Sequence, residues 1–161
     1  MMFVTSSEEE TLAAAAEIAA ALPRKAVVLL IGNLGAGKTT MTKGIVEALG
    51  VAPASEVSSP TFTLIHEYGD PARVYHIDLY RLDTEAEVET LGLDELFDRD
   101  ALVLIEWGER FPRLMPPDRW EIRIEHLGGD RRRATVSRCM PAWAQDCTSE
   151  TNCPLSQDKP K

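Results

Sequence analysis

The sequence has no long hydrophobic run and few cysteines, and each absence argues against particular classes of protein. No apolar run reaches 18 residues, so we expect no membrane-spanning helix and no membrane partner. The first residues, MMFVTSSEEE, lack a basic segment followed by an apolar stretch, which argues against a secretory signal and for a cytoplasmic protein. The 3 cysteines all lie in the last quarter without CxxC spacing, a pattern that suits neither a zinc site nor a disulfide framework.

Positive charge is also scarce, since the net charge is -9 over 161 residues. A protein that grips nucleic acid over its whole surface needs a cationic face to release counterions, so that function is disfavoured. The window 110–138 is the exception, because it holds eight arginines against four acidic residues. A contact with phosphate or RNA stays open there, and a solvated charged face is the simpler interpretation.

The sequence does contain the strand and helix patterns of an α/β fold. Ser7 and Glu10 have the spacing of a capping box, ahead of an alanine-rich helix that we expect to end near Leu22. The apolar run 26–31 predicts a buried parallel strand, and a helix is expected over 38–49 after a glycine-rich loop. Further strands are predicted within 63–79, 101–105, 120–125 and 132–139.

These elements predict the P-loop NTPase fold, with a mixed central sheet flanked by helices and antiparallel hairpins. Apolar and charged residues alternate over 120–125, which predicts a half-buried strand with its charged side chains in solvent. We expect one domain over residues 1–140. Residues 141–161 are polar and contain three prolines, so a disordered tail is predicted.

The segment GNLGAGKT, residues 32–39, matches the phosphate-loop pattern G-x-x-x-x-G-K-[ST] completely. Its glycines allow a tight turn that aims backbone N–H groups at phosphate. Lys38 supplies a positive charge for the β- and γ-phosphates, and Thr39 offers a hydroxyl to magnesium. The next helix points its positive N-terminal end at the same anion. The motif therefore predicts binding of ATP with Mg²⁺.

Two acidic residues near strand ends are candidates for the chemistry. Glu106 ends the strand ALVLIE and is predicted to hold magnesium through its water shell, with a surface glutamate as the alternative. Asp78 is predicted to orient the attacking water or a magnesium-bound water, or else to form a cap or pair with Arg81. On the same strand, His76 is interpreted as structural. The segment Ser59–Thr63 has the position of a switch that closes over the γ-phosphate.

Together these segments resemble the TsaE family, also called YjeE, of bacterial ATPases in tRNA threonylcarbamoyladenosine synthesis. The resemblance rests on five segments over roughly residues 8–138: GNLGAGKTT (32–40), SPTFTLIHEY (59–68), YHIDLYRL (75–82), LGLDELF (91–97) and LIEWGER (104–110). It implies a cytoplasmic, magnesium-dependent ATPase that is weak alone. The protein would use ATP hydrolysis to reset a TsaB–TsaD-type complex that modifies the adenosine next to the anticodon, meeting tRNA indirectly or weakly.

The resemblance also implies roles for individual residues. The phosphates would be held by Gly35, Ala36, Gly37, Lys38, Thr39 and Thr40. Thr39 and Glu106 would serve magnesium, and Asp78 would activate water or support the metal. Thr11 and Arg132 match positions near the nucleotide, although Arg131 and Arg133 leave the choice of arginine open.

Three other functions remain as alternatives. A small P-loop kinase fits the length and the loop, but no arginine-rich lid between two helices is evident. A regulatory GTPase commonly selects guanine with an N/TKxD segment, which this sequence lacks. A nucleotide-gated binding module would need ATP binding and no hydrolysis.

Overall fold

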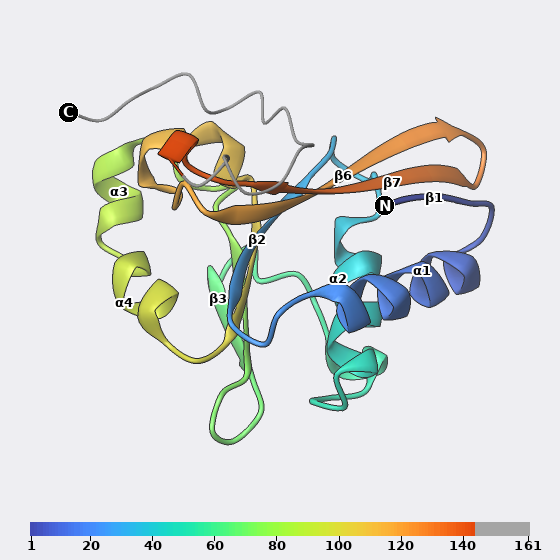
Figure 1. Ribbon diagram of the computed structural model, residues 1–161, viewed down its shortest axis with the longest axis horizontal. Coiled ribbons are helices and arrows are strands. Elements are labelled where there is room, and N and C mark those ends of the chain that lie inside the picture. Colours follow the sequence, from blue (N-terminus) through green and yellow to red (C-terminus); the bar gives the residue numbers. More distant parts are fainter. Residues whose placement is uncertain (144–161) are drawn as a thin grey trace.

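The computed structural model describes residues 1–143 (Figure 1). Its helices and strands, in chain order, are β1 (Met2–Thr5), α1 (Glu8–Ala21), β2 (Ala26–Ile31), α2 (Lys38–Ala48), β3 (Ile65–Tyr68), β4 (Val74–Asp78), α3 (Glu85–Glu89), α4 (Leu93–Asp98), β5 (Leu102–Glu106), β6 (Arg119–Gly128) and β7 (Arg131–Cys139). Short 3-10 helices cover Ala54–Glu56, Gly108–Arg110 and Pro112–Leu114. The tail predicted from residue 141 onward lies almost wholly outside the described residues.

Within residues 1–143 the strands form one 7-stranded mixed sheet in the order β1-β7-β6-β2-β5-β4-β3. Strand β2 is central and runs parallel to both β5 and β6, and β4 runs parallel to β5. The pairs β3–β4, β6–β7 and β1–β7 are antiparallel. The predicted P-loop NTPase fold with antiparallel hairpins is therefore confirmed.

Helices cover the sheet on both faces (Figure 1). On one face, α1 and α2 pack over a core that includes Val28, Leu30 and Leu104. On the other face, α3 and α4 cover a second core that includes Leu29, Ile77 and Ile105. Because alternate residues of β2 enter opposite cores, its run of six apolar residues is explained by burial on both sides.

The packing of α1 against α2 is unusually close at Gly44. A Cβ atom built on Gly44 would collide with the Cβ of Ala15 and lie 3.1 Å from the backbone oxygen of Leu12. Small residues on both helices permit this approach. The helix that follows the glycine loop is thereby fixed against α1.

The predicted start of α1 is confirmed, because the Ser7 side chain accepts a hydrogen bond from the backbone N–H of Glu10 at 3.1 Å. Helix α1 ends at Ala21, one residue before the predicted end, and the strand β1 was not anticipated. With only four residues, β1 offers too short a pattern for a prediction; it forms by pairing with β7.

Two expectations about the last hairpin are wrong. The charged residue Glu121 of β6 is 0% exposed, so the alternation does not place this charge in solvent, whereas Glu125 on the same strand is exposed. The reason is that Arg119 and Arg123 neutralise Glu121 from either side along the strand. Cys139, at the end of β7, is disulfide-bonded, and an odd number of cysteines does not exclude one such bond.

Candidate functional site

The glycine loop connects the end of β2 to the start of α2, as the motif predicts. Gly35 and Gly37 have φ angles of 77° and 107°, in the left-handed region that favours glycine. Gly32 needs a hydrogen side chain for another reason, because a Cβ there would lie 2.7 Å from the carbonyl oxygen of Ile124. Ala36 is buried against the protein, whereas residues 33–35 of the loop are exposed.

Lys38 is the first residue of α2, and its side chain lies back over the loop. The Nζ atom donates a hydrogen bond to the Gly32 carbonyl at 2.8 Å and lies 3.6 Å from the centre of the Trp107 ring. Burial lowers the pKa of Lys38 below its ordinary value of 10.5, while Glu106, Glu109 and Asp78 act in the opposite direction. The ammonium group is thus partly desolvated, and within residues 1–143 no carboxylate forms an ion pair with it.

Asp78 and Glu106 occupy equivalent positions at the ends of neighbouring parallel strands, where they are Cα partners in the register of β4 and β5. Both are buried. The alternative that Glu106 is a surface glutamate is therefore wrong. Thr39 and Thr40, half-buried, lie in the first turn of α2 at the same edge of the sheet. The structure places the predicted magnesium and water residues together, beside the glycine loop.

The carboxylate of Asp78 is held by neutral donors from the segment Ser59–Thr63. Its Oδ2 atom accepts the hydroxyl of Ser59 at 3.1 Å and that of Thr61 at 3.0 Å. Its Oδ1 atom accepts the backbone N–H of Tyr80 at 2.9 Å. Arg81 does not pair with Asp78, since its guanidinium donates instead to the Phe62 carbonyl at 3.2 Å. The predicted switch segment is thus in contact with the candidate water-orienting residue.

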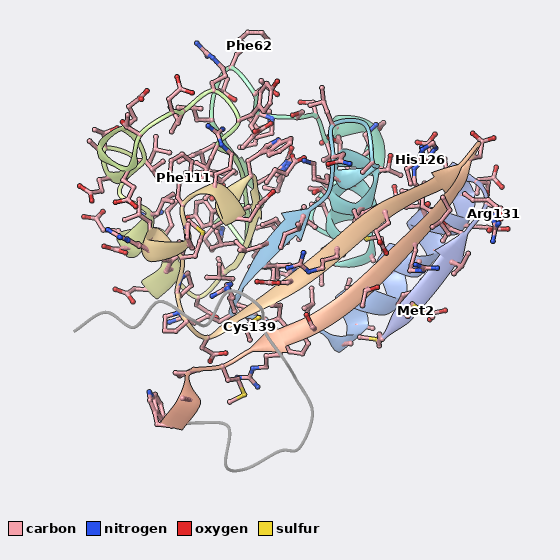
Figure 2. The ribbon with its side chains drawn as sticks, turned by 90° about the horizontal axis from the view of Figure 1, so that it is seen from above. Met2, Phe62, Phe111, His126, Arg131 and Cys139 are labelled. Carbon is pink, nitrogen blue, oxygen red and sulfur yellow. The ribbon has the colours of Figure 1, made fainter. Side chains whose placement is uncertain are left out.

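Phe62 lies in that segment and is 84% exposed. Figure 2 shows its ring projecting away from the body of the protein. Just after it, Leu64 has a positive φ angle of 68°, an uncommon conformation for a residue with a branched side chain. Such strained backbone concentrates at functional sites, which agrees with a role for this segment.

Glu106 is hydrogen-bonded to His76, which was interpreted from the sequence as structural. The two side chains meet at 2.6 Å between Nε2 of the histidine and Oε2 of the glutamate, and His76 is 0% exposed. This contact joins positions on adjacent strands, so the spacing along either strand gave no signal for it.

Arg132 contacts the glycine loop from the opposite side. Its Nε atom donates to the Ala36 carbonyl at 3.0 Å, whereas Arg133 pairs with Glu125. Thr11 lies on the same side of the loop, because its hydroxyl bonds to that of Thr5 at 2.9 Å and Thr5 is the Cα partner of Arg132. Of the three consecutive arginines, Arg132 is therefore the one at the loop.

A cavity of about 770 Å³ extends from the loop along the hairpin β6–β7. It is lined by Ile31, Gly32, Asn33, Leu34, Gly35, Ala36, Arg123, Ile124, Glu125, His126 and Arg132. His126 and Arg131 mark the hairpin in Figure 2. The residues of β6 that line this cavity were not among the site residues predicted from the sequence. They reach the glycine loop because β6 pairs with β2, and this pairing has no signal in the sequence.

The charge of the site suits a divalent cation bound with phosphate. Three carboxylates, those of Glu106, Glu109 and Asp78, act on one ammonium group, that of Lys38. Oxygen ligands of this kind are those that Mg²⁺ prefers. Residues 1–143 contain no group of three or more His, Cys, Asp or Glu side chains that could hold a metal ion by themselves. The residues present fit a magnesium ion that takes its other ligands from phosphate and water.

In the described part of the chain, no helix has the length and apolar character needed to cross a membrane.

Comparisons with known proteins find several similar sequences and a similar solved structure. The sequence model of the family described as threonylcarbamoyl adenosine biosynthesis protein TsaE matches residues 5–134. The chain is 44% identical over 134 residues to the tRNA threonylcarbamoyladenosine biosynthesis protein TsaE of Bacillus subtilis, covering 83% of this chain and 82% of that protein. It is 38% identical over 136 residues to the protein of the same name from Aquifex aeolicus, covering 84% and 94%.

Among solved structures, the crystal structure of YdiB from Bacillus subtilis is similar with a TM-score of 0.69 and 36% sequence identity. The similarity covers 86% of this chain and 85% of that one.

Proposed function

Because the chain belongs to the TsaE family, we propose that it binds and hydrolyses ATP with Mg²⁺ as an accessory protein of tRNA threonylcarbamoyladenosine biosynthesis. Its client is a TsaB–TsaD-type complex, which it resets between turnovers in the cytoplasm. The chain itself does not transfer the threonylcarbamoyl group, and it meets tRNA indirectly or weakly.

One observation supports hydrolysis more than any other. Asp78 and Glu106 are paired in the register of adjacent parallel strands, at the strand ends that flank the glycine loop. Burying two carboxylates costs desolvation free energy even when neutral groups hydrogen-bond to them, so the fold alone gains little from their presence. Beside a phosphate cradle they supply what hydrolysis requires, which is a magnesium site and a residue that orients water.

The roles of the residues follow from their contacts. The backbone of Gly35, Ala36 and Gly37 surrounds the phosphates, and the N-terminus of α2 adds its dipole. Lys38 exchanges its bond to the Gly32 carbonyl for the β- and γ-phosphates. Thr39 and Glu106 hold the magnesium ion, with Thr40 and Arg132 completing the nucleotide contacts.

Magnesium, when bound, neutralises phosphate charge and orders water molecules. Asp78 orients the attacking water, which takes the place of the hydroxyl of Ser59 or Thr61 on Oδ2. This exchange links the segment Ser59–Thr63 to the state of the nucleotide, because the segment loses a contact when water binds Asp78. Phe62 moves with that segment and lies exposed, where a partner protein can contact it. Thr11 supports the side of the loop near Arg132.

Reconstitution tests this function. The purified chain is mixed with TsaB, TsaD, unmodified tRNA, a threonylcarbamoyl-adenylate source and Mg²⁺-ATP, and modified adenosines per TsaD are counted by mass spectrometry. We expect the count to exceed one only with the chain and hydrolysable ATP. Asp78→Asn is expected to keep nucleotide binding and stop the count at one.

The alternatives predict different results, in this assay or in a separate measurement of phosphate transfer or nucleotide competition. A nucleotide-gated binding module would support many turnovers with a non-hydrolysable ATP analogue. A kinase would transfer labelled γ-phosphate to a small molecule rather than to water, and a GTPase would prefer GTP in competition. Any of these outcomes would contradict the proposed resetting ATPase.

A further inference from the structure

His76 lies buried in the middle of β4 and faces the same core as its neighbours along that side of the sheet. Val74 and Leu104, which share this face, are apolar, as a buried strand predicts. A histidine is the exception at such a position. Its Nε2 atom lies 2.6 Å from Oε2 of Glu106, which is a short hydrogen bond.

The other ring nitrogen of His76, Nδ1, lowers the stability of the folded state. Among residues 1–143 no group forms a hydrogen bond with Nδ1, which is buried. An unpaired buried polar atom costs about 1–3 kcal/mol. Packing alone would therefore be better served by leucine, and the benefit of the histidine must come through its contact with Glu106.

That contact fixes a side chain that would otherwise be flexible. A glutamate loses up to about 2 kcal/mol of rotamer freedom when it is held in one orientation. With Nε2 donating to Oε2, the imidazole imposes this order before any ligand arrives. The second oxygen, Oε1, forms no hydrogen bond within the described residues and is left available.

We propose that His76 is a positioning residue, which holds the Glu106 carboxylate so that Oε1 faces the magnesium ion or its water shell. This inference rests on the proposed magnesium role of Glu106. It assigns His76 no contact with nucleotide or metal. The histidine acts only through the orientation of Glu106.

Three substitutions at position 76 separate positioning from packing. Glutamine can place an N–H near the position of Nε2, so His76→Gln keeps the donor. Asparagine is too short to reach Glu106, so His76→Asn keeps polarity and loses the contact. His76→Leu fills a similar volume with an apolar side chain and removes the hydrogen-bond donor. Glu106→Gln serves as the reference for the magnesium site itself.

The main measurement is the Mg²⁺ concentration that half-saturates the magnesium-dependent gain in affinity for a fluorescent ATP analogue. We expect His76→Leu and His76→Asn to raise this concentration about tenfold, and His76→Gln to raise it less than threefold. Affinity for the analogue in EDTA is expected to change less than twofold in all three. Thermal unfolding of each variant without nucleotide measures any effect on packing.

The outcomes distinguish the positioning role of His76 from the magnesium role of Glu106. If Glu106→Gln raises the Mg²⁺ requirement and the His76 variants do not, His76 is a packing residue and the inference is wrong. If Glu106→Gln leaves the requirement unchanged, the magnesium role of Glu106 is wrong and the inference falls with it. Should His76→Leu not fold, the Gln and Asn variants decide, because equal values for those two would also overturn the inference.

Discussion

Two regions of this protein bury charged side chains, and they treat them in opposite ways. We call the first the loop site, made of residues 32–39 with His76, Asp78 and Glu106. The second is the hairpin cluster, Arg119, Glu121 and Arg123 on β6. In the hairpin cluster the carboxylate is in contact with cations, because Arg119 and Arg123 bind Glu121 at 3.0 and 3.2 Å.

In the loop site Lys38 and Asp78 contact neutral groups. Lys38 donates to a backbone carbonyl, and Asp78 accepts two hydroxyls and one backbone N–H. Since a buried charge is stabilised best by an opposite charge in contact, the loop site is left less stable than it could be. The difference separates charges that hold the fold together from charges that are kept for a ligand.

The largest expected effect is on the hairpin cluster. Glu121→Gln removes the carboxylate that contacts Arg119 at 3.0 Å, and Arg119 is only 6% exposed. We expect the free energy of unfolding to fall by about 3 kcal/mol or more, as measured by urea denaturation. Glu125→Gln is the matched control, because Glu125 forms an exposed pair with Arg133 and should lose less than about 1 kcal/mol. Equal losses would show that burial does not distinguish the two pairs.

The opposite pattern is expected in the loop site. Lys38→Ala removes a charge-assisted phosphate contact worth about 1.5–3 kcal/mol, so ATP affinity should fall roughly 100-fold in isothermal titration calorimetry. Without nucleotide, stability should not decrease, because the substitution removes a desolvated charge. Lys43→Ala on the same helix should change neither quantity much. A large loss of stability for Lys38→Ala would mean that this lysine is structural.

A smaller effect is expected for the neutral donors of Asp78. Thr61→Val removes one hydroxyl from Oδ2 and should loosen the segment Ser59–Thr63 by about 1 kcal/mol. Backbone amides of residues 59–64 should then exchange hydrogen about fivefold faster. Thr63→Val provides the control, because Thr63 is exposed and does not contact Asp78. Unchanged exchange for Thr61→Val would mean that other contacts hold the segment.

The smallest effect concerns Glu109, whose Oε2 atom is buried and has no hydrogen bond among the described residues. Burial raises the pKa of Glu109 above its ordinary value of 4.5, so the folded state keeps this proton longer than the unfolded chain does. The protonated Glu109 carboxyl therefore contributes its full stabilisation below pH 4.5. This stabilisation is lost as the pH rises through the pKa of the folded state.

Glu109→Gln should remove that decline when urea unfolding is measured from pH 4 to 7. Glu125→Gln, at an exposed position, should leave the decline in place. If the two variants give the same pH profile, the proton in question is not on Glu109.

The local elements of this fold were predictable because their signals are local. The six apolar residues of β2 and the glycine loop before α2 predicted one strand, one turn and one helix within a residue or so of their observed bounds. The places of Lys38 and Thr39 followed from the same motif. The contact between Asp78 and Ser59 or Thr61 did not, since it joins segments 17 to 19 residues apart.

The hairpin cluster shows why a simple alternation failed. Period-two patterning assigns charged residues to solvent, yet Arg119, Glu121 and Arg123 share one face of β6 and neutralise one another. An Arg-x-Glu-x-Arg spacing on a strand is the signal that could have predicted this. No comparable signal exists for His76, because its partner Glu106 is set by the order of the strands in the sheet.

The tight crossing of α1 and α2 at Gly44 has a mechanical consequence. Helix α2 carries Lys38 and Thr39 at its first turn, and it has no room to slide toward α1. The phosphate loop is thus the rigid part of this site. Arg132 holds it from the side of the hairpin, through its hydrogen bond to the Ala36 carbonyl. We expect the displacement that accompanies nucleotide exchange to fall on residues 59–64 instead, where the chain is held by hydroxyl groups and Phe62 is already in solvent.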